Sequence, residues 1–131
     1  MKYLLDTNIC IALINGKDLP LRQKVKNLSV DALFICSIVK AELLYGLKKS
    51  QNRAANEQRL AVFFSEIPSI PFDDAAADQF ATVRTILEQS GTVIGSYDMM
   101  IAGVAQANSL TLVTRNVDEF ARIPTLRLEA W

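Results

Sequence analysis

Three acidic residues and one amide fall at positions where a folded chain would bring polar groups together. Asp6 follows a short apolar run, and Glu42 lies on a largely apolar helical stripe. Asp98 lies in the first turn of an apolar helical segment, and Asn116 follows a second apolar run. In α/β proteins such positions meet at the carboxyl edge of the sheet, where ligands bind. We therefore expect Asp6, Glu42, Asp98 and Asn116 to converge at one edge.

Carboxylates gathered at one place repel each other unless a cation neutralises them. A ligand set made only of oxygen atoms selects Mg²⁺ or Mn²⁺ over zinc or copper. Such an ion lowers the pKa of bound water and stabilises charge on a phosphoryl group, which favours hydrolysis of a phosphodiester. Without the ion, we expect repulsion to raise the pKa of acids at this edge.

Two of these acids, Asp6 and Glu42, also have a simpler interpretation. Asp6 could be only the N-cap of the helix that follows it, because aspartate is a preferred capping residue. Glu42 could simply pair with a nearby lysine or arginine, because an inward-facing carboxylate needs a cation or several donors. The sequence of these segments leaves both interpretations open.

The chain contains no histidine. This excludes Ser-His-Asp and Cys-His nucleophilic catalysis and most zinc or other transition-metal sites. The two cysteines, Cys10 and Cys36, lie in apolar surroundings without a CxxC pairing, so we expect buried, reduced thiols. Any catalysis must then rely on carboxylates, lysines, hydroxyls or a hard metal ion.

Composition predicts one domain over residues 1–131, since half of the 131 residues are hydrophobic and no linker interrupts them. Lys plus Arg and Asp plus Glu each number 14, so no overall basic field attracts nucleic acid and any RNA contact must be local. No apolar run is long enough to span a membrane, and the first residues lack a signal-peptide pattern. These features predict a cytoplasmic protein.

The elements that must position the acids alternate between strands and helices along the chain, which predicts an α/β fold with a parallel sheet covered on both faces. We expect Ser37 and Ser96 to cap two of the helices, and the small residues around Gly103 to let the second helix press closely on the sheet. The predicted strands are residues 3–5, 33–36, 67–72, 110–113 and 126–128, and the predicted helices begin near residues 9, 19, 37, 54, 74 and 96.

The order and spacing of several short motifs resemble the PIN-domain ribonuclease toxins of the VapC family. The resemblance covers essentially the full length of the chain. The motifs are Leu5-Asp6-Thr7-Asn8, Ala41-Glu42-Leu43, the stretch from Ile94 to Gly103, Val113-Thr114-Arg115-Asn116, and Leu126 to Glu129 with Trp131. Each motif is weak alone, but together they are specific.

The resemblance implies a three-layer α/β/α sandwich with a central, mostly parallel sheet. It also implies an Mg²⁺-dependent endoribonuclease, with Mn²⁺ as a substitute, that cleaves structured RNA such as tRNA. Its partners would be a VapB-type antitoxin that inhibits it and a second copy of the chain, giving a homodimer and a hetero-oligomer with the antitoxin.

The resemblance also assigns roles to residues. Asp6 and Asp98 would be direct metal ligands, and Glu42 would be a ligand or would orient the attacking water. Asn116 stands where many PIN domains carry a fourth acid, with Asp118 in reserve. The remaining assignments are Thr7, Asn8 and Thr114 as groups that orient the ligands, and Arg115 as a substrate-binding residue.

Two other classes of protein share parts of this pattern. A non-catalytic PIN-like binding module would have the same fold but would not need the three acids. A receiver-type phosphotransfer domain would need an adjacent pair of acids before its phosphorylated aspartate and a lysine after a late strand, whereas Asp6 stands alone and Arg115 occupies the late position.

The helix pair that follows Glu42 carries apolar side chains that an antitoxin segment could cover. Core packing is the alternative for each of these side chains. They are Tyr45, Leu47, Val62, Phe63 and Phe64.

Overall fold

The structure, a computed structural model, describes all of residues 1–131 and contains one five-stranded sheet. All neighbouring strands pair in parallel, in the order β3-β2-β1-β4-β5, so β1 lies at the centre. The predicted parallel sheet is confirmed. The strands are β1 Tyr3–Leu5, β2 Leu33–Cys36, β3 Ser69–Ile70, β4 Thr111–Val113 and β5 Leu128–Glu129.

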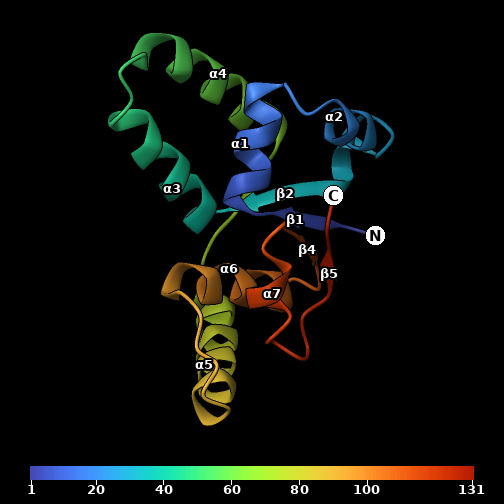
Figure 1. The fold of residues 1–131 in the computed structure, drawn as a ribbon, viewed down its shortest axis with the longest axis vertical. Helices are drawn as coiled ribbons and strands as arrows, with labels where there is room; N and C mark the ends of the chain where they lie inside the picture. Colours follow the sequence, from blue (N-terminus) through green and yellow to red (C-terminus); the bar gives the residue numbers. More distant parts are fainter.

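Helices cover both faces of the sheet, which confirms the predicted three-layer α/β/α arrangement. In Figure 1, α1 to α4 lie on one side of the strands and α5 to α7 on the other. The helices are α1 Thr7–Asn15, α2 Leu19–Lys26, α3 Ser37–Lys48, α4 Arg53–Glu66, α5 Asp74–Gln89, α6 Ser96–Ala107 and α7 Val117–Phe120.

The register of the central strands brings two polar residues side by side. Leu5, the last residue of β1, pairs with Val113, the last residue of β4. The backbone N–H of Asp6 donates to the carbonyl of Val113 at 3.1 Å, one residue beyond the strand end. Asp6 and Thr114 therefore leave the sheet together at its carboxyl edge.

The strands are short, and the central strands β1, β2 and β4 place apolar side chains in one continuous core of 27 buried residues. Both Leu4 and Leu5 are fully buried, as expected for a central parallel strand with helices on each face. Cys10 and Cys36 are free and buried, which confirms the expected state of the thiols, and burial raises the pKa of each. No helix combines the length and apolar character needed to cross a bilayer.

Several local predictions were wrong. The predicted capping serines are instead the first residues of their helices, after Cys36 and Gly95, and neither helix has a side-chain cap. The last strand lies at Leu128–Glu129, later than predicted. The short helix α7 and a 3₁₀ helix at Val30–Ala32 were not predicted, because elements of three or four residues are too short to show a periodic pattern.

The small-residue face of α6 presses on α5 at Gly103, although the sequence predicted contact with the sheet. A Cβ atom at this glycine would lie 2.8 Å from the carbonyl oxygen of Ala76 and 3.1 Å from the backbone nitrogen of Phe80. The two helices therefore approach each other closely at Gly103.

Candidate active site

Asp6 is a buried acid that caps a helix. It is 6% exposed, and its Oδ1 accepts a hydrogen bond from the backbone N–H of Ile9 at 2.9 Å, so its interpretation as an N-cap is confirmed. Its Oδ2 accepts a hydrogen bond from the hydroxyl of the fully buried Thr114. Burial raises the pKa of Asp6, although the Thr114 and Ile9 bonds oppose the shift.

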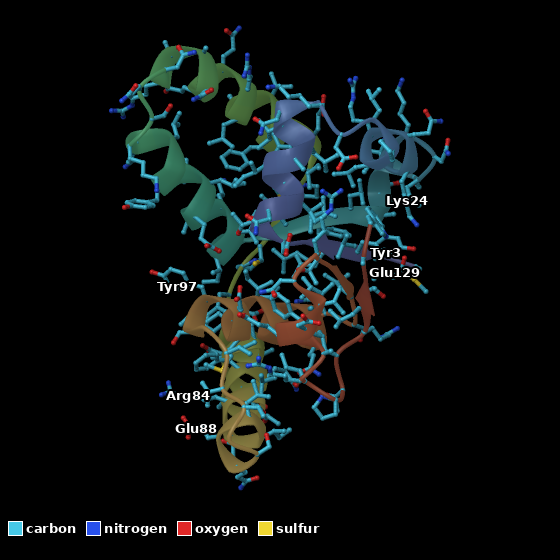
Figure 2. The ribbon with its side chains drawn as sticks, viewed as in Figure 1. Tyr3, Lys24, Arg84, Glu88, Tyr97 and Glu129 are labelled. Carbon is cyan, nitrogen blue, oxygen red and sulfur yellow. The ribbon has the colours of Figure 1, made fainter.

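Glu42 projects from α3 and is half-buried. Its Oε1 accepts a hydrogen bond from the hydroxyl of Thr7 at 2.8 Å, which links α3 to the start of α1. Glu42 forms no ion pair, so its interpretation as the partner of a lysine or arginine was wrong. The two ion pairs of the protein are Arg84–Glu88, labelled in Figure 2, and Arg115–Asp18.

Asp98 lies in the first turn of α6 and shares a pocket of about 400 Å³ with Glu42. The pKa of Asp98 is raised from 3.8 to about 6; burial is the largest cause, and the negative charges of Glu119, Glu42 and Asp6 also contribute. Repulsion from neighbouring acids therefore acts on Asp98 as expected, whereas burial alone raises the pKa of Asp6.

Glu119 acts on Asp98 more strongly than the other two acids do, yet the sequence analysis did not select it. It lies on α7 and is partly buried, one residue before the buried Phe120. Asp118 on the same turn is exposed and is not among the charges that act on Asp98. The signal that could have identified Glu119 is the pair Phe120 and Ile123, whose apolar spacing predicts a helical turn with one side held to the core.

Asn116 is the N-cap residue of α7, and its exposed side chain makes no capping hydrogen bond. Its backbone N–H donates to the hydroxyl of Thr114 at 3.0 Å, so it helps to orient the group that bonds Asp6. Asn8 is exposed and lines a cavity together with Thr7 and Glu42.

Arg115 makes its side-chain bonds away from Asp6, Glu42 and Asp98, although its positive charge opposes the rise in the pKa of Asp6. Its Nε donates to the carbonyl of Trp131 at 2.8 Å, and its guanidinium forms the ion pair with Asp18 at 2.5 Å. This pair lowers the pKa of Asp18. The second oxygen of Asp18 caps α2 by accepting from the backbone N–H of Leu21 at 3.0 Å, so Arg115 ties the end of β4 to that helix start.

The donor set at this edge fits a hard divalent cation. Asp6, Glu42, Asp98 and Glu119 offer only carboxylate oxygens, and none of them is in an ion pair. No three acidic or thiol side chains are arranged to hold one ion together. An ion here would therefore take one or two carboxylates and keep several waters, which is the usual coordination of Mg²⁺.

This sheet order and its acidic edge match a known class of protein. The family model of the PIN domain matches residues 3–126, so the chain belongs to the PIN-domain family. It is 42% identical over 132 residues to ribonuclease VapC2 of Rickettsia felis, covering 100% of this chain and 98% of that protein. It is 41% identical over 134 residues to the tRNA(fMet)-specific endonuclease VapC of Salmonella typhimurium, covering 100% and 98%. Within the PIN-domain family, the chain belongs with the VapC ribonucleases.

Solved structures support the same assignment. The chain superposes with a TM-score of 0.94 on a chain of the DNA-bound VapBC crystal structure from Salmonella typhimurium, at 39% identity, covering 100% of this chain and 98% of that chain. The TM-score is 0.91 for VapBC2 from Rickettsia felis bound to a promoter DNA fragment, at 41% identity, covering 100% and 99%.

Proposed function

We propose that this chain is an Mg²⁺-dependent endoribonuclease and the toxin of a toxin–antitoxin pair. One observation carries the proposal: the charges of Glu119, Glu42 and Asp6 all act on Asp98, at a sheet edge where none of these acids has a basic partner. Uncompensated carboxylates destabilise a fold, and a bound cation would relieve that cost. Family membership and the names of the relatives support the same activity.

Each acid has a distinct role in the proposed reaction. Asp6 and Asp98 hold the cation, and Asp6 is kept in place by its bonds from Ile9 and Thr114. Glu42 uses one oxygen to accept from Thr7, so its other oxygen is available to orient the attacking water. A divalent cation, when bound, supplies an activated water and neutralises charge on the phosphate. Glu119 adds negative charge that favours cation binding.

We propose structured RNA, and tRNA in particular, as the substrate. The Salmonella relative is named as a tRNA(fMet)-specific endonuclease, which supports this class of substrate. The net charge of the chain is zero, so recognition depends on local contacts close to the acids. The start of α6 also offers its backbone N–H groups near Asp98, with no side chain capping them.

We propose that a VapB-type antitoxin lies along the trough between α1, α3 and α4. Two cavities of about 250 and 570 Å³ follow this trough, and they share Ile14 and Arg59. Val62 is exposed and lines this trough, and Phe63 lines it too although most of its side chain is buried. Tyr45 is exposed but lines neither of the two cavities. Leu47 and Phe64 are partly buried against the core.

We also propose, from the family resemblance, that residues 1–131 act as one PIN domain. The same resemblance supports a homodimer and a hetero-oligomer with the antitoxin.

The test is RNA cleavage by the purified protein. Bulk tRNA would be incubated with Mg²⁺, with Mn²⁺ and with EDTA, and the product ends would be mapped. We expect cleavage with either metal, none in EDTA, and none after a VapB-type antitoxin is added. Asp98→Asn should abolish cleavage, whereas the matched control Asp78→Asn, at an exposed position on α5, should retain it.

Cleavage that persists in EDTA would refute the metal-dependent mechanism. No cleavage of any RNA by metal-loaded protein would instead favour the non-catalytic binding module.

A further inference from the structure

A second cavity, of about 690 Å³, opens beside the acidic pocket. Glu42 and Tyr97 line both the cavity and the pocket, so the two spaces adjoin. The walls of the cavity come from α1, α3 and α6, and from Lys49 at the end of α3. Any molecule held in this cavity would lie next to the proposed reaction centre.

Two exposed tyrosines line this cavity, and each neighbours an acid. Tyr97 directly precedes Asp98 on α6, and Tyr45 follows Glu42 by one helical turn on α3. Tyr97 is 59% exposed and Tyr45 is 65% exposed, and neither ring packs against another aromatic ring. Figure 2 shows Tyr97 projecting outward from the start of α6, on the side where α3 approaches that helix. The core does not use these rings. The ammonium of Lys49 lies over one face of the Tyr45 ring, so the other face of Tyr45 and the Tyr97 ring are available to a ligand.

One basic side chain also lines the cavity. The Nζ of Lys49 lies 4.8 Å from the centroid of the Tyr45 ring, and Thr7 and Asn8 add polar groups to the wall. Exposed aromatic rings together with a cation form the combination that binds single-stranded nucleic acid, because the bases stack on the rings and the cation attracts the phosphates. The trough proposed for the antitoxin also holds a basic side chain, Arg59, but neither tyrosine lines it.

Building on the proposed function, we infer that an unpaired nucleobase beside the cleaved phosphodiester stacks on Tyr97 and Tyr45. Lys49 contacts a neighbouring phosphate. A base-paired stem cannot offer such a base, because its bases already stack on each other within the helix. The two tyrosines therefore make the enzyme select an unpaired loop nucleotide within a structured RNA.

The test measures stacking separately from cleavage. The probe is a hairpin RNA that carries one 2-aminopurine in its unpaired loop, and binding is followed by quenching of its fluorescence in the Asp98→Asn background with Mg²⁺ present. We expect quenching by this protein. Adding Tyr97→Ala should abolish the quenching and weaken binding by about 5-fold to about 150-fold, the range of one base–aromatic stack. Tyr97→Phe keeps the ring and should retain both.

Cleavage kinetics provide the second readout in the otherwise unsubstituted protein. Tyr97→Ala and Tyr45→Ala should raise KM for a hairpin substrate, whereas Val30→Ala, exposed at the opposite edge of the sheet, should not. A substrate lacking only the loop base should show the same rise in KM with the unsubstituted protein and no further rise with Tyr97→Ala.

Two outcomes would overturn the inference. If the hairpin is cleaved but neither quenching nor KM responds to Tyr97→Ala, the stacking site is absent although the ribonuclease function stands. If Tyr97→Ala weakens an antitoxin complex and leaves RNA binding unchanged, the cavity belongs to the antitoxin. Quenching that depends on Tyr97 in a protein that cleaves no RNA would support the site and refute the proposed function.

Discussion

Replacing Asp98 with asparagine should stabilise the metal-free protein at neutral pH. The pKa of Asp98 is raised from 3.8 to about 6, which corresponds to roughly 3 kcal/mol for a group fully shielded from solvent. Asp98 is half-buried, so solvent and salt screen part of this, and about 1–1.5 kcal/mol remains. For a chain of 131 residues, Asp98→Asn should then raise Tm by about 3–6 °C in EDTA at pH 7.5.

The pH dependence of this effect has a definite sign. The folded-state pKa lies above the unfolded value, so ionised Asp98 destabilises the fold, and the penalty is complete above about pH 6. The penalty falls as the pH drops from about 6 toward 3.8 and is lost below 3.8, where both states become protonated. Thermal melts in EDTA across this window should show the unsubstituted protein and Asp98→Asn converging toward the acidic end.

Added Mg²⁺ should reverse the order of stability. The unsubstituted protein should gain about 2.7 kcal/mol at a metal concentration 100 times Kd, and Asp98→Asn should lose most of that gain. Asp98→Ala controls for a structural role, although Asp98 makes no hydrogen bond that the alanine would remove. The reasoning is refuted if Asp98→Asn melts below the unsubstituted protein in EDTA at pH 7.5, or if the difference does not change with pH.

Two further substitutions test how the fold holds the site. Thr114→Val should cost about 1–3 kcal/mol, because it removes the hydroxyl that donates to Asp6 and accepts from the N–H of Asn116, whereas Thr114→Ser should recover most of the loss in urea unfolding. Gly103→Ala should cost about 1–3 kcal/mol, because its Cβ would lie 2.8 Å from the Ala76 carbonyl oxygen. The matched control Gly46→Ala, with no atom within 4 Å of its added Cβ, should gain about 0.5–1 kcal/mol, and equal effects of the two substitutions would contradict the proposed packing.

The layers of the fold could be predicted because their signals are periodic and long enough to recognise. The runs that became β1, β2 and β4 are mostly apolar, and α5 and α6 carry clear helical stripes. The elements that were not predicted are short. The turn of α7 spans four residues and forms because the buried Phe120 and Ile123 anchor it, a tertiary effect that the local sequence shows only weakly.

The same limit explains why Glu119 was missed in favour of Asn116 and Asp118. A sequence gives only the distance along the chain from the end of a strand, and by that measure Asn116 is nearer to β4 than Asp118 or Glu119 is. The direction of each side chain depends on the geometry of α7. In α7 Asp118 is exposed, whereas Glu119 is partly buried and its negative charge raises the pKa of Asp98. Residues on long elements could be assigned to the site, whereas residues on a single turn could not.

The two interpretations of Asp6 prove to be compatible. One oxygen caps α1 and the other accepts from Thr114, but each carboxylate oxygen has two lone pairs, so both keep capacity for a cation. Asparagine would cap the helix about as well as aspartate does. Burial raises the pKa of Asp6, which means that its negative charge is unfavourable for the folded state at neutral pH. The helix therefore does not require an acid at this buried position, and the acid is explained by what its charge would bind.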